Sequence, residues 1–89
     1  MIEFIWDSGF KKSFKKKIIK NPTLNKKFED ALTIFSKDPF DQKLKTHKLS
    51  GALKEYWAFA VDYNTRIVFK FLPNQKILLI DIGSHEEVY

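Results

Sequence analysis

The spacing of apolar residues changes once along this chain, near residue 52, from a helical period to a strand-like alternation. In the first part, Phe10, Phe14 and Ile18 recur every four positions and mark one face of an amphipathic helix. In the second part, large apolar residues recur at every second position, the pattern of strands that cover a core. Helices and strands in separate parts of one short chain predict an α+β fold.

The first part predicts one strand and two helices. A strand is expected at residues 2–6, and Asp7-Ser8 can cap the helix that follows. That helix is expected over residues 9–20 and ends at Asn21-Pro22, because proline is tolerated in the first turn of a helix but not in its interior. A second amphipathic helix then runs to about Lys37. We expect the two helices to form an antiparallel hairpin.

The second part predicts three strands in a meander with short turns between them. The polar connection that precedes it, residues 38–52, has no sustained period, and no element is expected there. We therefore expect a single domain over residues 1–89, in which the N-terminal strand and helical hairpin pack on a curved antiparallel sheet. The three strands are expected at residues 56–61, 66–71 and 77–82, with turns at 62–65 and 72–76.

Composition narrows the class of protein. With 89 residues, nine phenylalanines and two tryptophans, the chain can build one aromatic-rich core. The absence of cysteine excludes disulfides, thiol catalysis and cysteine zinc sites, and two histidines argue against a structural metal. No cofactor is expected. The N-terminal apolar run is too short for a signal peptide and no stretch has membrane-spanning length, so we expect a cytoplasmic protein.

The formal net charge is +5, which favours a polyanionic partner. Basic domains bind nucleic acids, acidic proteins or anionic membrane surfaces through long-range attraction and counterion release. The alternative is that a lysine-rich surface only keeps a small domain soluble. Charge alone leaves both interpretations open.

Several short motifs follow one another in the second part of the chain. The central motifs are Leu49-Ser50-Gly51, Tyr56-Trp57 and residues 62–69, which read Asp-Tyr-Asn-Thr-Arg-Ile-Val-Phe. The terminal motif, residues 82–89, reads Ile-Gly-Ser-His-Glu-Glu-Val-Tyr. Each motif is short, but in their order and spacing they resemble the RelE/ParE superfamily of toxins, with the YafQ-like ribonucleases the most similar. The resemblance covers essentially the whole chain, and the expected order of elements is similar as well.

The resemblance implies the toxin of a type II toxin–antitoxin pair. RelE-like and YafQ-like toxins cut messenger RNA on the translating ribosome, whereas ParE-like toxins share the fold but inhibit DNA gyrase, so fold alone does not decide the function. The implied partners are the ribosome, mRNA and a cognate antitoxin whose acidic segment covers the toxin's site. No membrane partner is implied.

Cleavage of RNA by its own 2′-hydroxyl requires a base, an acid and a fixed positive charge at the phosphate, but no metal. His47 and His85 are the only side chains whose unperturbed pKa lies near neutrality. YafQ-like toxins carry functional histidines at both matching positions. The alternative is two exposed loop histidines without a function. If the sheet forms as expected, both histidines lie at one rim of the same face.

Two further residues are predicted to act with the histidines. Arg66 is the sole arginine, and it points opposite Ile67, away from the face that the helices cover. RelE-like toxins carry a functional arginine at this place, where it can stabilise the pentavalent phosphate. The alternative is a strand-surface arginine paired with Asp62 or another carboxylate. In RelE-like toxins a tyrosine at the position of Tyr89 stacks on a base or assists proton transfer, although an aromatic here can also cap the core. The predicted catalytic residues are therefore His47, Arg66, His85 and Tyr89.

Two groups of lysines are candidates for contacts with RNA. Those of the first predicted helix are expected to contact ribosomal RNA phosphates without reading sequence, unless they form only a solvated face. Those near His47 are expected to contact substrate phosphates. The first group is Lys11, Lys12, Lys15, Lys16 and Lys17; the second is Lys43, Lys45 and Lys48.

The chain departs from its relatives at several site positions. The lysines of RelE-like toxins are replaced around Trp57 and Phe59, and a histidine of YafQ-like toxins is replaced by Ala60. A catalytic carboxylate of YafQ-like toxins falls near Asn64, beside Asp62, in a turn where such residues are usually structural. Fewer titratable groups remain than in either relative, which leaves the assignment of acid and base open.

Overall fold

The structure is a computed structural model that describes residues 1–51 and 55–88, so the role predicted for Tyr89 lies outside the described residues. A five-stranded sheet forms its centre, with the strands in the order β1-β5-β4-β3-β2. The pairs β2–β3, β3–β4 and β4–β5 are antiparallel, which confirms the meander. The pair β1–β5 is parallel. The strands are β1 (Glu3–Trp6), β2 (His47–Lys48), β3 (Trp57–Ala60), β4 (Thr65–Leu72) and β5 (Lys76–Ser84).

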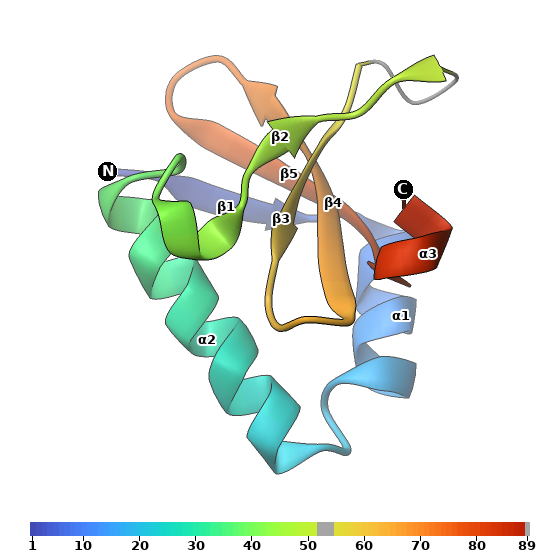
Figure 1. Ribbon diagram of the computed structural model, residues 1–89. Coiled ribbons are helices and arrows are strands. Elements are labelled where there is room, and N and C mark those ends of the chain that lie inside the picture. The colour runs from blue at the N-terminus through green and yellow to red at the C-terminus, as the bar shows by residue number, and fades with distance from the viewer. Residues whose placement is uncertain (52–54, 89) are drawn as a thin grey trace.

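Two helices follow β1, as predicted: α1 (Ser8–Lys17) and α2 (Pro22–Lys37). The Asp7 carboxylate accepts a hydrogen bond from the Gly9 amide at the start of α1, and the Asn21 side chain accepts one from the Leu24 amide at the start of α2. The first helix ends three residues earlier than expected, because the chain turns before Asn21. From this turn the helices diverge as they run along the sheet (Figure 1), so the hairpin is open.

The sequence did not predict three short elements. The polar connection contains the 3₁₀ turn η1 (Gln42–Leu44) and strand β2, and the chain continues after β5 into α3 (His85–Val88). Elements of two to four residues are too short to show a period, so alternation and helical spacing cannot reveal them. None of the described helices has the length and apolar character needed to cross a membrane.

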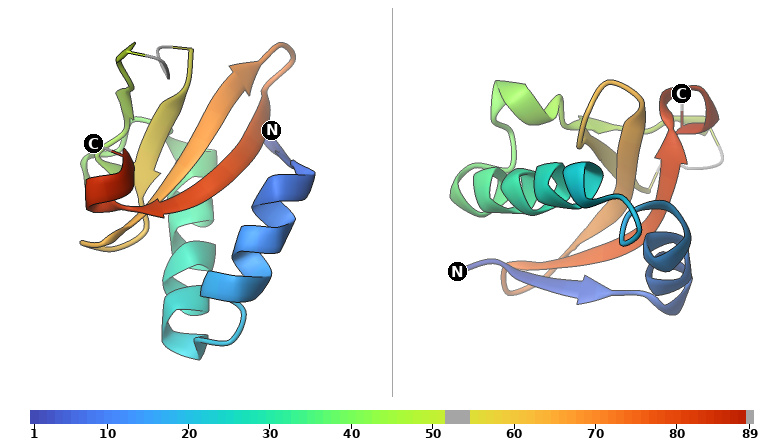
Figure 2. Two further views of the ribbon diagram at one scale, coloured as in Figure 1. Left: turned by 90° about the vertical axis from the view of Figure 1, so that its right-hand side faces the viewer. Right: turned by 90° about the horizontal axis from the view of Figure 1, so that it is seen from below.

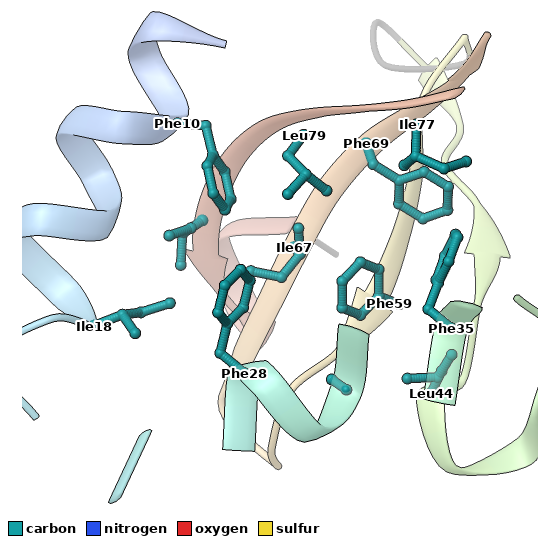
Figure 3. Packing of buried hydrophobic residues seen from close by; sticks show 12 residues of the cluster. Phe10, Ile18, Phe28, Phe35, Leu44, Phe59, Ile67, Phe69, Ile77 and Leu79 are labelled. Atoms are coloured by element: carbon teal, nitrogen blue, oxygen red, sulfur yellow. The ribbon is translucent and has the colours of Figure 1, made fainter. Parts of the chain in front are cut away.

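The core lies between α1, α2 and one face of the sheet (Figure 3). Phe35 of α2 is fully buried, and its ring centroid lies 5.3 Å from that of Phe59 and 5.2 Å from that of Phe69. Trp6 of β1 contacts Phe10 edge-on at 5.0 Å. Edge-to-face and tilted contacts of this kind add to the free energy gained by burying the rings.

The other face of the sheet is not covered by α1 or α2 (Figure 2). Its buried apolar residues are fewer than those of the core face: Ala58 and Val68 form a second, smaller cluster with Leu49. Alternation along β3 and β4 places Ala60 and Arg66 on this face, where they pair directly across the two strands. A face with small side chains leaves room for a ligand.

The β3–β4 turn is held by a network of hydrogen bonds. The Asp62 carboxylate accepts bonds from the amides of Asn64 (3.0 Å) and Thr65 (2.7 Å), and the Val61 amide donates to the Thr65 carbonyl. The Asn64 carbonyl accepts a bond from the His85 amide at 2.8 Å, so the first residue of α3 is fixed against this turn. The turn is therefore well defined before any ligand binds.

We expect Phe35→Ala to lower the free energy of unfolding by about 3–5 kcal/mol, because it leaves a cavity where four other phenylalanine rings pack. Urea denaturation followed by circular dichroism measures this loss. Phe40→Ala is the matched control, because the Phe40 ring is over half exposed, at 55%. Equal losses in the two variants would contradict the proposed core.

We expect Asp62→Ala to lower the free energy of unfolding by about 1–2 kcal/mol, because two backbone amides lose their acceptor. Asp62→Asn keeps a side-chain oxygen at the same place and should recover most of that stability. Thermal unfolding of both variants tests this expectation. If asparagine were as damaging as alanine, the charge of Asp62 rather than its hydrogen bonds would be what matters.

Candidate functional site

A hollow of about 270 Å³ opens between η1 and the β3–β4 turn. Three of its lining side chains are cationic, and the one lining carboxylate, that of Asp62, already accepts bonds from the turn. The hollow therefore favours an anionic ligand. It is lined by Lys43, Lys45, Ala60, Val61, Asp62, Tyr63 and Arg66.

Arg66 is the only buried charged side chain among the described residues, at 3% exposure. Its Nη1 donates to the carbonyl of Asp62 and, at 3.3 Å, to that of Thr65. A buried guanidinium is tolerated only when it is hydrogen-bonded, and these carbonyls also fix its orientation. Arg66 lies on the predicted face, and its side chain is buried because it turns back onto the β3–β4 turn. The group of Asp62 that accepts its hydrogen bond is the backbone carbonyl.

His47 is the first residue of β2 and pairs with Ala58, so its half-buried side chain shares a face with Ala58 and Arg66. Its Nδ1 lies 3.0 Å from the Lys45 carbonyl oxygen. When Nδ1–H donates to this oxygen, Nε2 is the basic nitrogen of the ring. His47 and Arg66 lie two strands apart and are offset by two residues along the strands. This spacing corresponds to about 12 Å between their Cα atoms.

His85 begins α3 on the other side of the β3–β4 turn. Its ring lies parallel to that of Tyr63, with 6.2 Å between centroids and 10° between planes. Tyr63 also lines the hollow, so it connects the His85 side of the turn to Arg66. The structure thus brings Arg66 between two histidine-bearing elements, β2 and α3, which come from separate parts of the chain.

The predicted lysines fall into different places. Lys43 and Lys45 line the hollow together with Arg66. Lys48 pairs with Trp57, and because side chains alternate along a strand, it points to the face opposite His47. The expectation that Lys48 lies beside His47 at the site is therefore wrong.

The lysines of α1 are exposed, and the hollow is lined by none of them. Lys17 donates to the Ile82 carbonyl at 2.8 Å and lines a second hollow of about 330 Å³ together with Asn64 and Thr65. It therefore lies close to the other side of the β3–β4 turn. The remaining α1 lysines, Lys11, Lys12, Lys15 and Lys16, form an exposed basic surface.

Sequence reasoning missed Tyr63 as a site residue. The available signal was an aromatic residue inside a polar turn, directly between Asp62 and Asn64, where no core position requires one. Among the described side chains, no group of three or more histidine, aspartate or glutamate residues is arranged to hold a metal ion.

Comparison with known proteins identifies the family. The family model described as the bacterial toxin of type II toxin–antitoxin system, YafQ, matches residues 2–89. No curated protein matches the chain significantly.

Several solved structures share the fold over their whole length. YafQ from Escherichia coli BL21(DE3) has 18% identity and a TM-score of 0.76, with 100% of this chain and 99% of that chain covered. The E. coli DinJ–YafQ complex gives 21% identity and a TM-score of 0.68, with the same coverage. A metal-bound toxin from Helicobacter pylori gives 21% identity and a TM-score of 0.73, with both chains fully covered.

These findings confirm the resemblance to RelE/ParE-type toxins and the predicted fold. The family model extends over nearly all of the chain, including the turn that holds Arg66 and the end that carries His85. The chain therefore belongs to the YafQ family of toxins of bacterial type II toxin–antitoxin systems.

Proposed function

We propose that this toxin is a ribosome-dependent endoribonuclease that cuts messenger RNA by attack of the RNA's own 2′-hydroxyl. The observation that carries the proposal is the cationic hollow with Arg66 at its base, between the elements that bear His47 and His85. A phosphodiester in this hollow would meet a fixed positive charge, with a histidine-bearing element on each side.

In the proposed reaction, one histidine removes the proton of the 2′-hydroxyl as its oxygen attacks phosphorus. The bond from phosphorus to the 5′-oxygen breaks, and the other histidine donates a proton to that oxygen. The products are a 2′,3′-cyclic phosphate and a free 5′-hydroxyl. The Arg66 guanidinium stabilises the negative charge that builds up on the non-bridging oxygens, with Lys43 and Lys45 holding the flanking phosphates.

A cognate antitoxin is the proposed protein partner, in line with the DinJ–YafQ complex of E. coli. An acidic antitoxin segment would fit the positive hollow and the +5 charge of the chain. The exposed lysines of α1 are proposed to contact ribosomal RNA, and Tyr89 stays a predicted fourth site residue.

Replacing either histidine by glutamine should lower the rate of cleavage by about 100-fold to 10,000-fold while the fold is kept, because glutamine cannot exchange a proton at neutral pH. The measurement is translation of a defined message on purified ribosomes, with new 5′ ends mapped for wild type, His47→Gln and His85→Gln. Lys26→Gln, on the exposed side of α2, is the matched control.

Undiminished cutting in both histidine variants would overturn the acid–base proposal. Intact translation with the wild-type toxin, together with DNA damage in growing cells, would instead support gyrase inhibition of the ParE type.

Lys43→Ala and Lys45→Ala should each weaken cleavage and lower the slope of log rate against log salt by about one, because each removes one phosphate contact. Lys48→Ala is a stringent control, because Lys48 has the same charge and lies near Lys45 in sequence but faces the other side of the sheet. Rates measured over a series of KCl concentrations test this. A Lys48→Ala variant as defective as the other two would contradict the proposed position of the substrate.

A further inference from the structure

We infer that Tyr63 is a stacking platform for an RNA base next to the phosphate that occupies the hollow. The inference rests on the proposed function in so far as the ligand is single-stranded RNA. It concerns a residue that neither the sequence pattern nor the proposed acid–base chemistry assigns.

The exposure of Tyr63 is not explained by folding. At 79%, it is the most exposed aromatic side chain among the described residues, and Phe40 follows at 55%. Phe40 packs against Trp57 and Phe71 at the edge of the core, whereas the ring of Tyr63 is stacked on a histidine. A large ring left in water contributes little to stability, and this ring lines a hollow that also holds three cationic side chains.

The backbone that carries Tyr63 is fixed in advance. Both residues that follow it donate amide hydrogen bonds to Asp62, and the carbonyl of Asn64 is bonded to the His85 amide. The guanidinium of Arg66 also donates to the Asp62 carbonyl directly before Tyr63. A ring on a preorganised turn loses little conformational entropy on binding, which favours its use as a contact surface.

The surroundings of the ring match what a nucleotide presents. Tyr63 lines the same hollow as Lys43, Lys45 and Arg66, so a base on the ring would place its phosphate among three cations. On its other side the ring lies parallel to that of His85. Proteins bind single-stranded RNA through aromatic rings that stack on splayed bases, beside cations that hold the backbone.

The competing explanation is that Tyr63 only orients the His85 ring. In that case Tyr63 would affect cleavage but not the binding of RNA. A stacked base, by contrast, makes RNA affinity depend on an aromatic ring at position 63, whatever the state of His85. The two explanations therefore separate in a binding experiment.

The experiment measures binding of a 2′-O-methyl hexanucleotide that carries one 2-aminopurine, whose fluorescence is quenched by stacking and whose blocked 2′-oxygen prevents cleavage. Isolated toxin, as wild type, Tyr63→Phe, Tyr63→Leu and Phe40→Leu, is titrated against this probe at low salt. We expect saturable quenching for wild type, Tyr63→Phe and Phe40→Leu. Tyr63→Leu should abolish the quenching and weaken affinity by about 5-fold to 150-fold.

Three results would each overturn the inference. The first is a Tyr63→Leu variant with the affinity and quenching of the wild type, and the second is a Phe40→Leu variant that loses as much affinity as Tyr63→Leu. The third is a wild-type toxin that does not bind the probe. Thermal unfolding of Tyr63→Leu close to that of the wild type is the check on its fold. The ribosome assay distinguishes this failure from that of the proposed function. If cutting depends on the histidines but RNA binding does not depend on Tyr63, only the stacking role is contradicted. If RNA binding depends on Tyr63 but no cutting occurs, only the nuclease proposal is contradicted.

Discussion

The structure depends on a core that lies on only one face of the sheet. The two long helices and the large buried rings, among them Phe10, Phe28 and Phe35, all pack on that face. The opposite face then needs only small residues such as Ala58 and Val68, and it can carry a charged side chain without disturbing the main core. The main core and the candidate site thus lie on different faces of the same strands, so a substitution at the site need not disturb the core.

Arg66 links these two roles. Burial of a guanidinium costs free energy unless its donors are bonded, and the carbonyls of the β3–β4 turn supply acceptors. The same bonds hold the group where three cations converge, so its orientation is set during folding and not by the ligand. A charge held in place before the ligand arrives stabilises developing negative charge without reorganisation. The proposed chemistry takes advantage of this rigidity.

Much of the architecture could be predicted: the two helices and the three-stranded meander follow from periodicity, and the cap at Asp7 follows from the residue type before the first helix. What could not be predicted depends on tertiary contacts. A two-residue strand such as β2 forms only because β3 offers it partners, and its register decides that His47 and not Lys48 faces the site. The burial of Arg66 and the exposure of Tyr63 likewise depend on how one turn folds back, and neither is visible in a local pattern.

The lengths of the strands also bear on how copies of the chain behave toward one another. The longest strands, β4 and β5, lie inside the sheet, while the edges are formed by β1 with four residues and β2 with two. Short edges present few unpaired backbone groups to a neighbouring chain, which limits sheet extension between molecules. A protein rich in phenylalanine and strand-forming segments is in this way protected from aggregation by its topology, apart from any protection that a bound partner provides.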